Sequence, residues 1–487
     1  MSILKTKTLS PEKIKKQNER RLKEIKKWEA EKAKPKKNYY LVYLIFVITL
    51  IYATDEIASQ IGTLMKTEIA NDLFSKFGNS SVGVLDILSM VVVPFQMIGL
   101  VYRPLADKFG RKTFLIINTF GMSLALFIIF LSNNLFLYFV GACMVQFFIP
   151  HDMHVVYIME TAPAKHRARM YSVIKFVANM GVMLIPVLRR VLMTDTSEWR
   201  KVYFIPAVIG LVCSFIALLC AREPEAFIDS RLRFLKMTDE ERELAENNQK
   251  EENAQGGLIN AIKFAFRHKQ LKWLYISAAI VNLGFLTTIE YQPIMTYGYA
   301  NYYLRNGMFS SLDEAVNAAG IGAVTTALFL FTVGSAVAQV VMGFVSDSKG
   351  RKQSAIVMAS ICLVSFVGFF VGSNLNWSPY LVGFLCGSCI GSYYAVNDVI
   401  IMMIGESSPT NLRSSAISAQ YIVVAVGVAL SYIVGLPLIT YLGNSYAGII
   451  VLCFAIPGFV SALITLSLKT HDTKGVDMDT VTGCEWD

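Results

Sequence analysis

The chain has 487 residues, of which 54% are hydrophobic and only 17% are charged. Soluble globular proteins carry about 25% charged residues, so the composition excludes an ordinary soluble domain and predicts an integral membrane protein. The formal net charge is +9, and residues 1–38 account for it with fourteen Lys or Arg and five Glu. The rest of the chain is therefore nearly neutral.

The basic segment 1–38 comes first. Basic residues beside a membrane span remain on the cytoplasmic side, so we expect this tail to lie in the cytoplasm and to bind anionic lipid headgroups. A basic tail also suggests nucleic acid, but the adjacent span makes lipid the preferred interpretation and no nucleic-acid partner is expected. The first apolar run begins near Tyr39 and is too long for a cleavable signal peptide.

Apolar runs of about 20 residues, each long enough to cross the hydrocarbon core as a helix, then recur along the chain. We identify twelve, at about 40–62, 82–102, 113–132, 135–159, 168–190, 202–221, 272–296, 320–343, 353–373, 379–404, 414–441 and 446–468. Lys and Arg concentrate in alternate loops, which predicts a multi-pass protein of the cell membrane with both termini in the cytoplasm. Arg189 and Arg190, at the end of the fifth run, are expected to snorkel to the interface. The Tyr-rich stretch 297–319 is predicted to be a long outer loop.

Two motifs recur at nearly one offset. Residues 107–112 (Asp-Lys-Phe-Gly-Arg-Lys) return 240 positions later at 347–352 (Asp-Ser-Lys-Gly-Arg-Lys), and a Glu-x-x-Pro-x-x-x-Arg pattern at 160–167 returns 246 positions later at 406–413. The repeat predicts two homologous halves, 39–221 and 272–469, joined by a cytoplasmic linker 222–271 and followed by a cytoplasmic tail 470–487. Internal repeats in an apolar many-span chain are typical of secondary transporters, whose solute site lies between the halves.

The linker carries two local helix signals. Thr238 and Glu241 form a capping-box pattern, which predicts a short polar helix. The stretch 258–271 places apolar residues at helical spacing among basic ones, which favours an amphipathic helix on the membrane surface.

The repeated motifs resemble those of the major facilitator superfamily over residues 39–469. The family pattern Gly-x-Leu-x-Asp-x-x-Gly-Arg-Lys is kept at 343–352 with Val345 for Leu, and at 103–112 with Arg103 for the first Gly. The Glu-x-x-Pro-x-x-x-Arg pair is similar to that of the sugar-porter and organic-ion branches, whereas the glutamine-rich seventh span of sugar porters is missing. The resemblance implies an all-α fold of twelve transmembrane helices in two pseudo-symmetric six-helix bundles, with transport by alternating access.

The same resemblance implies a gating role for the repeated loops. Gly110 and Gly350 permit a tight turn between helices, and the acid of each motif can contact a helix N-terminus or a basic partner until the inner gate opens. The expected gating residues are Asp107, Gly110, Arg111, Lys112, Glu160, Arg167, Asp347, Gly350, Arg351, Lys352, Glu406 and Arg413.

Ionisable residues inside the spans cost free energy and are functional candidates by default. The acids identified on this basis fall on spans one, four, seven and ten, which in the superfamily line the central cavity. We predict a proton-coupling role for this set, with Asp55 as first choice because sugar porters place a proton-coupling Asp in span one. An alternative is purely structural pairing, for example Asp152 with Lys175 at equal depth. The set comprises Asp55, Glu56, His151, Asp152, His154, Lys175, Glu290 and Asp398.

An excess of carboxylates favours a cationic or zwitterionic solute. His151 and His154 share a helix face and raise metal transport as an alternative, although no resident metal or cofactor is expected. Polar and aromatic residues on spans seven, ten and eleven can bind solute hydroxyls or rings, or serve only helix packing: Tyr291, Gln292, Tyr393, Tyr394, Asn397 and Gln420.

The sequence therefore predicts a proton-coupled symporter of a small organic solute that works as a monomer. It is not expected to be an enzyme, because neither a nucleophile–base pair nor a nucleotide-binding loop is apparent. The alternatives are a proton-driven exporter of amphipathic cations, a facilitative uniporter and, from another class, a membrane solute sensor that does not transport.

Overall fold

The computed structural model describes residues 11–34, 40–92, 94–95, 110–148, 157, 174, 176–238, 241, 258–409, 412–476 and 485. These residues form helices and the turns that connect them, and this part of the chain contains no strand. The predictions for Asp107, His151, Asp152, His154, Glu160, Arg167 and Lys175 lie outside the described residues.

The described part of the first half contains helices and two 3₁₀ segments, η1 (Ser75–Ser80) and η3 (Thr196–Trp199). In chain order the helices are α2 (Tyr40–Leu64), α3 (Lys66–Leu73), α4 (Ser81–Val92), α6 (Arg111–Phe130), α7 (Leu135–Phe148), α10 (Leu184–Leu192) and α11 (Arg200–Cys220).

The second half is described continuously except for residues 410–411. It includes two short 3₁₀ segments, η4 (Asn282–Phe285) and η6 (Asn444–Tyr446), and one π-helical turn, η5 (Gly320–Val324). Its helices are α15 (Lys269–Val281), α16 (Leu286–Arg305), α17 (Leu312–Ala319), α18 (Thr325–Lys349), α19 (Arg351–Asn374), α20 (Pro379–Glu406), α21 (Arg413–Leu442) and α22 (Ala447–Lys469).

Nine helical segments of the described chain are long and apolar enough to cross a membrane. In lipid each backbone N–H and C=O must be paired internally, which is why the apolar runs fold as helices. Six of the nine lie in the second half, from Lys269–Arg305 to Asn444–Lys469, and three lie in the first, at Ile45–Leu64, Arg111–Phe130 and Thr196–Cys220.

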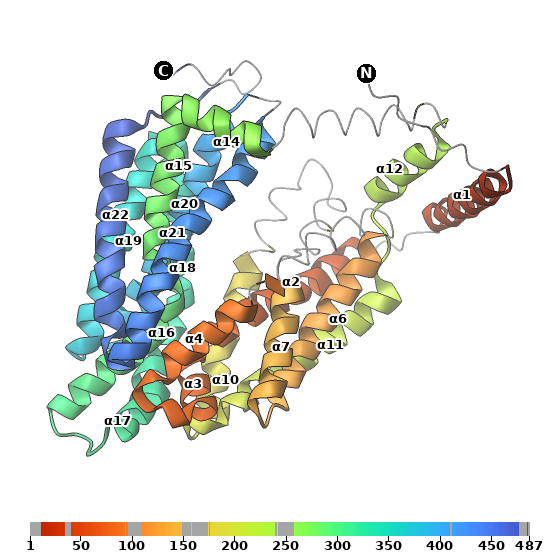
Figure 1. Cartoon of the computed structure of the whole chain (residues 1–487). Helices are drawn as coiled ribbons and strands as arrows, with labels where there is room; N and C mark the ends of the chain where they lie inside the picture. Colours follow the sequence, from red (N-terminus) through yellow and green to blue (C-terminus); the bar gives the residue numbers. More distant parts are fainter. Residues whose placement is uncertain are drawn as a thin grey trace.

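In the described part of the chain, three helices lie outside the two bundles: α1 (Pro11–Lys32), α12 (Glu225–Lys236) and α14 (Leu258–Arg267). They lie at the end of the molecule where α22 finishes, which we call the terminal end (Figure 1). The opposite end, where α3, α10 and α17 lie, is called the far end. The capping box expected in the linker is present, since the Thr238 N–H donates to Glu241 and the Glu241 N–H donates to the Thr238 hydroxyl.

The two bundles converge at the far end and separate toward the terminal end (Figure 1). Helix α4 packs against α21, α10 against α18, and α3 against α16. Among the described residues, the hydrogen bonds that join the halves all lie at this far end. The structure is therefore a state whose far end is closed.

The predicted outer loop at 297–319 is wrong in its first part, because α16 continues as helix to Arg305. Tyr297 and Tyr299 are buried rather than interfacial. The Tyr299 hydroxyl donates to the Trp377 carbonyl at 3.0 Å, and the Tyr297 hydroxyl accepts from the Asn444 amide at 2.9 Å. Paired hydroxyls let these rings pack inside the bundle.

A glycine stripe joins α18 to α20. A Cβ built at Gly383, Gly387 or Gly391 would lie 1.8, 1.8 or 2.6 Å from a backbone carbonyl oxygen of α18. Only glycine fits at this distance, so the two backbones touch directly, as small residues allow between membrane helices. The contact fixes α20 against α18.

Candidate functional site

A cavity of about 400 Å³ lies between the two halves. Helices α2, α3, α4, α6, α7 and α11 line it from the first half, and η4, α16, α20 and α21 line it from the second. Its walls are mostly apolar and aromatic, and the polar side chains among them include Ser59, Lys66, Asp86, Gln146 and Tyr394. This size and mixture are typical of small-molecule sites.

Lys66 is the centre of a buried ionic triad that joins the halves. Its ammonium lies 2.5 Å from Asp86 Oδ1 and 2.6 Å from Glu290 Oε1, and it also donates to the Ile289 carbonyl at 3.0 Å. The three side chains are at most 6% exposed. Lys66 begins α3 immediately after α2 ends, Asp86 lies in the second turn of α4, and Glu290 lies in the second turn of α16.

The triad has one cation for two carboxyl groups. Asp86 and Glu290 contact the same ammonium group, and the second oxygen of each, Oδ2 and Oε2, is buried without a hydrogen-bond partner among the described residues. A buried unpaired charge is unfavourable, and neighbouring acids that share a site hold a proton between them. The surplus carboxyl group therefore marks the triad as a place where a proton can bind.

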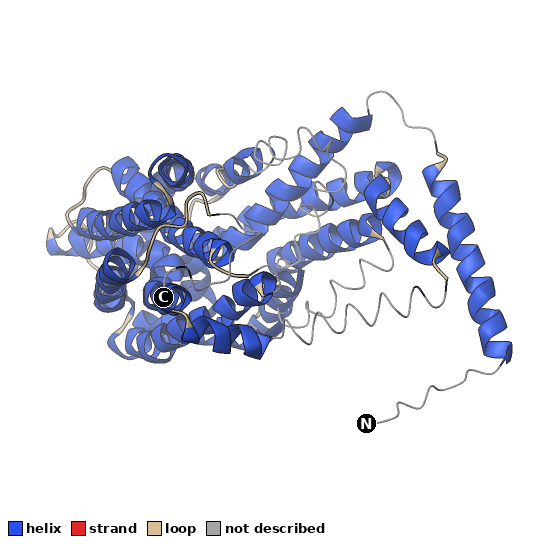
Figure 2. Ribbon diagram, turned by 90° about the horizontal axis from the view of Figure 1, so that it is seen from above, coloured by secondary structure: helices blue, strands red, loops and turns tan. Residues whose placement is uncertain are grey.

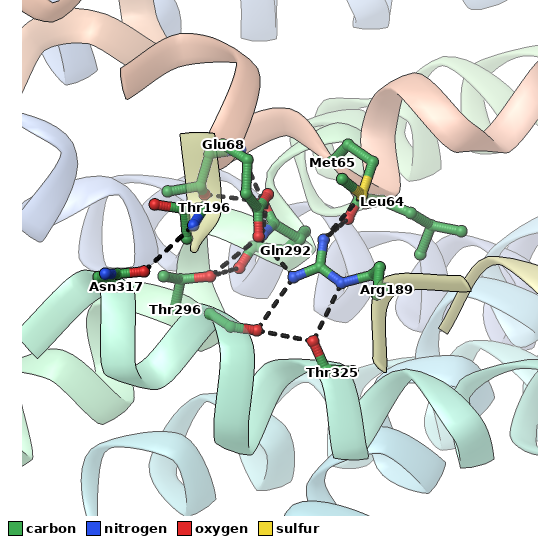
Figure 3. Close-up of polar contacts among 11 residues, drawn as sticks. Leu64, Met65, Glu68, Arg189, Thr196, Gln292, Thr296, Asn317 and Thr325 are labelled. Atoms are coloured by element: carbon green, nitrogen blue, oxygen red, sulfur yellow. Dashed lines mark hydrogen bonds and ion pairs between the residues drawn. The ribbon is translucent and has the colours of Figure 1, made fainter. Parts of the chain in front are cut away.

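Arg189 forms a second buried contact between the halves, shown in Figure 3. Its guanidinium donates Nε to Thr325 Oγ1 at 3.1 Å and Nη2 to the Gly320 carbonyl at 3.0 Å, both in the second half. Within the first half it donates to the Leu64 carbonyl at 3.0 Å and forms an ion pair with Glu68 at 2.5 Å. A guanidinium has five N–H groups in a fixed plane, so one side chain holds four segments together.

Gln292 extends this contact on the second half. Its Oε1 accepts from the Thr67 N–H at 2.9 Å and from the Thr67 hydroxyl at 2.7 Å, while its Nε2 donates to Glu68 Oε2 at 3.1 Å and to Thr296 Oγ1 at 3.2 Å (Figure 3). Every polar atom of the amide is therefore used in closing the far end. The side chain is fully buried and does not line the cavity.

A smaller contact closes the edge of the far end. The Asn317 amide donates to Asp195 Oδ2 at 2.8 Å and its oxygen accepts from the Thr196 N–H at 3.3 Å. Asp195 also caps η3, and the hydrogen bond from the Ser197 N–H lowers the pKa of its carboxyl group. The carboxylate therefore remains charged throughout the neutral range.

At the terminal end of the second half, a network surrounds the repeated motif. Arg351 lies 3.2 Å from Glu406 and 3.4 Å from the exposed Asp347. Asp472 accepts from the Lys352 N–H at 3.1 Å at the start of α19. Gly350 has φ 101°, a left-handed conformation, and a Cβ there would lie 1.8 Å from Asp472. Arg413 donates to the carbonyls of residues 405 and 408.

The first half has a matching arrangement. Glu223 accepts from the Arg111 N–H at 2.8 Å and from the Lys112 N–H at 3.2 Å at the start of α6. Gly110 has φ 117° and approaches the same carboxyl group. Burial raises the pKa of Glu223, although the two backbone donors act in the opposite direction. Glu223 and Asp472 each stand three residues after the helix that closes their half. In both halves an acid interacts with the exposed N–H groups of a helix start.

The structure distributes the predicted proton-coupling residues unevenly. Glu290 lies in the triad, whereas Asp55 is buried in α2 and does not line the cavity. Glu56 is half-buried and does not line the cavity. Asp398 is exposed on α20.

The predicted solute-binding residues separate in the same way, and only Tyr394 lines the cavity. Tyr291 stacks on Phe331 with ring centroids 4.9 Å apart. The Tyr393 hydroxyl donates to Asn282, whose amide donates to Asn397 at 2.8 Å. Gln420 is buried, and its Oε1 has no hydrogen-bond partner in the described part of the chain.

Sequence reasoning does not find several residues of the far-end contacts, among them Lys66, Asp86 and Arg189. Lys66 follows the first apolar run, so the sequence suggests that it belongs to a loop. Asp86 lies inside the second apolar run, and the cost of burying its charge is the signal that could have identified it. The expectation that Arg189 snorkels is wrong, since the residue is 1% exposed, while its neighbour Arg190 is exposed. Its five N–H groups all have partners inside the protein, which removes the need for water.

The family model "Major Facilitator Superfamily" matches residues 39–395 and 299–478. The chain belongs to the major facilitator superfamily. It is a multi-pass membrane transporter, and not an enzyme, like the other members found.

Several curated proteins of the superfamily are similar in sequence. A facilitated glucose transporter homolog of Caenorhabditis elegans is 30% identical over 31% of this chain and 28% of its own. The solute carrier family 2, facilitated glucose transporter member 5 of Pongo abelii is 26% identical over 60% of this chain, and the match spans 61% of that protein. The proline/betaine transporter of Salmonella typhimurium is 23% identical over 72% and 68% of the two chains.

Solved structures of the superfamily share the fold. The inward-open xylose transporter XylE from E. coli superposes with a TM-score of 0.60 at 15% identity, over 90% of this chain and 98% of its own. The nucleoside transporter NupG gives a TM-score of 0.60 at 14% identity, over 90% and 100% of the two chains. The protein therefore has the twelve-helix major facilitator fold.

Proposed function

We propose that this transporter couples the movement of a small organic solute to that of a proton, by symport. The observation that supports the proposal is the Lys66 triad, in which two buried carboxyl groups share one ammonium group across the interface of the halves. A transporter that only lowers the barrier for a neutral solute does not need this arrangement, which is costly to bury.

Alternating access would change the partners of Lys66. Lys66 and Asp86 belong to the first half and Glu290 to the second, so separation of the halves at the far end would remove Glu290 from the ammonium group. Lys66 and Asp86 would remain a neutral pair, while the carboxyl group of Glu290, left without its cation, would take up a proton. When the far end closes, Lys66 returns and competes with that proton, which then leaves with the solute on the terminal side.

The solute would bind in the cavity beside this triad. The cavity has a charged end at Lys66 and Asp86, hydroxyl and amide groups at Ser59 and Gln146, and the exposed ring of Tyr394. This combination suits a small polar solute, and the surplus carboxyl favours a cationic or zwitterionic one. The names of the similar proteins, which refer to glucose, proline or betaine, xylose and nucleosides, agree with a small polar solute.

We further propose that the terminal end faces the cytoplasm of a cell-membrane protein that acts as a monomer, with the solute and protons as its partners. The tail 1–38 with its surplus of basic residues supports this orientation. The terminal network of the second half, which includes Arg351 and Glu406, would then surround the inner gate.

The test is proton flux into proteoliposomes that contain a pH-sensitive dye. Cationic, zwitterionic, neutral and anionic solutes would be added in turn to the wild type, Glu290→Gln and Asp55→Asn. We expect one solute class to drive proton entry in the wild type and in Asp55→Asn, and proton entry to disappear in Glu290→Gln while some solute exchange remains.

Other outcomes separate the alternatives. Solute uptake without proton movement in the wild type would contradict coupling and indicate a uniporter. Proton movement opposite to the solute would indicate an exporter. Loss of coupling in Asp55→Asn with normal coupling in Glu290→Gln would place the proton on α2 instead of in the triad.

A further inference from the structure

Helix α1 packs on α12 through a small apolar cluster of its own. Trp28 is 4% exposed and its ring meets Phe227 edge-to-face, with centroids 5.5 Å apart. Ile228, Leu232 and Leu235 complete the cluster from α12, and Ile25 packs against it. This core is separate from those of the membrane bundles.

Polar contacts fix the register of α1 on α12. Lys32 pairs with Asp229 at 2.5 Å, Glu24 with Arg231 at 3.2 Å, and Glu29 with Lys236 at 2.6 Å, so each of these three pairs joins opposite charges across the interface. The Arg21 guanidinium donates to the carbonyls of residues 235 and 237 at the last turn of α12. A cation at a helix C-terminus satisfies the free carbonyl groups there. The N-terminal helix is therefore bound to the linker specifically.

One aromatic ring connects this helix pair to the gating motif. Phe227 contacts Trp28 on one side, and the Arg111 guanidinium lies over its ring at 5.6 Å. Glu223, four residues before Phe227, caps the start of α6 through the N–H groups of Arg111 and Lys112. A displacement of α1 would therefore be transmitted to the start of α6 through Phe227.

The face of α1 that points away from α12 is basic. Arg20, Lys23, Lys26 and Lys27 are exposed and recur at helical spacing, with Glu19 beside them. Seen from above, α1 runs along the edge of the molecule, outside the outline of the membrane helices (Figure 2). It lies at the terminal end and precedes the first span closely, since α2 starts at Tyr40. A bilayer around the membrane helices would therefore lie beside this face.

We propose that the exposed basic face of α1 binds acidic phospholipid headgroups, and that this contact holds Phe227 against Arg111 and so stabilises the start of α6 in the gating motif. The proposal extends the lipid contact expected for the tail and rests on the transporter function, but it needs neither the triad nor a proton. A basic cluster beside an anionic membrane gains about 1 kcal/mol per residue, which is about fivefold in binding.

The experiment uses the full-length protein in nanodiscs of phosphatidylcholine alone or of phosphatidylcholine and phosphatidylglycerol in equal parts. Hydrogen–deuterium exchange would follow α1, α12 and the first turn of α6 in three proteins. The first is the wild type, and the second is a neutral variant with Gln at the four basic positions. The third is a matched control that keeps the charge through Arg20→Lys, Lys23→Arg, Lys26→Arg and Lys27→Arg.

The lipid effect should follow the charge of this face. We expect the acidic lipid to slow exchange in α1 and in the first turn of α6 by about fivefold or more in the wild type and in the charge-retaining control. The neutral variant should exchange at the same rate in both lipids.

Two further measurements test the two parts of the proposal separately. Phe227→Leu should keep the lipid-dependent protection of α1 and lose it at the start of α6. A soluble anion, glycerol phosphate, added to phosphatidylcholine nanodiscs should protect neither segment if the ligand is a membrane surface.

Other results would contradict the proposal. Equal exchange in the two lipids for the wild type, or the same lipid effect in the neutral variant, would overturn lipid binding by this face. Protection of the α6 start that persists in Phe227→Leu would overturn the coupling through the ring. Because exchange is measured without solute or a proton gradient, a failure of proton coupling would leave these outcomes unaffected.

Discussion

The two ends of this transporter are held together in different ways. At the far end, Lys66 and Arg189 bind groups from both halves and are almost completely buried. At the terminal end, Glu223 and the Arg351–Glu406 pair act within one half each. In the proposed alternating-access cycle, charges that join the halves would separate, whereas charges within a half would remain in place. The far-end contacts are therefore the ones that depend on the conformational state.

The largest expected effect is that of Lys66→Met. It removes the shared cation and leaves Asp86 and Glu290 buried together, and breaking a buried ion pair costs about 3–5 kcal/mol. We expect a lower unfolding temperature in detergent and loss of solute-driven proton flux. The double variant Lys66→Met/Glu290→Gln should recover part of the stability without recovering the flux. Normal proton coupling in Lys66→Met would remove the triad from the mechanism.

Arg189→Met should shift the protein toward a state that is open at the far end. Hydrogen bonds to a charged group contribute about 1.5–3 kcal/mol each, so losing this contact should change the conformational equilibrium at least about tenfold. Spin labels at Phe77→Cys and Met308→Cys, both exposed, would report the separation of the halves. The exposed Cys220 and Cys453 would be replaced by Ser.

The matched control is Arg190→Met. It makes the same substitution at the neighbouring position, where the arginine is exposed. It should leave the label distance unchanged. Equal distance distributions in Arg189→Met and the wild type would show that the contact does not hold the far end closed.

Glu406→Gln tests the terminal end. The change weakens the contact with Arg351 and the hydrogen bond from Thr473, and because both side chains of the ion pair are partly exposed the loss should be about 1 kcal/mol. Thermal unfolding would measure it. The far-end label distance should stay that of the wild type, because the contact does not cross between the halves. A change in that distance would show that the two ends are coupled directly.

The smallest effect is expected for Asp195→Asn. The pKa of Asp195 is lowered in the folded protein, so its contribution is present above the ordinary pKa of an Asp and is lost only as the pH falls through the lower folded value. Between about pH 5 and 8 the contact with Asn317 should not titrate. The variant should lose no more than about 0.5 kcal/mol and keep the pH profile of transport. A changed profile would place a titrating group at the edge of the far end.

The difference between the two ends also explains what the sequence could predict. Apolar runs and a repeat at one offset are sufficient to predict the membrane fold, because both can be recognised from the order of the residues alone. The repeat also points to Arg351 and Glu406, which the structure brings together within one half. Both residues of such a pair lie in the same half, so the repeat of the halves reveals the pair.

The far-end residues have no such pattern. At the offset of the first motif, the positions that correspond to Lys66 and Asp86 are Asn306 and Thr326, so neither charge is repeated. A contact that joins two different halves needs different residues on each side, and symmetry in the sequence cannot locate it. Gln292 is predicted to bind solute because it is polar inside a span, but its partners come from another segment of the chain.

The glycine stripe on α20 has a consequence for how this protein can evolve. Because Gly383, Gly387 and Gly391 touch the backbone of α18, even one added methyl group would force the two helices apart. Cavity residues outside the triad, such as Ser59 and Tyr394, are exposed instead, and they can be exchanged singly. Substrate preference is therefore free to drift among descendants of this chain, while these three positions should stay glycine in all of them.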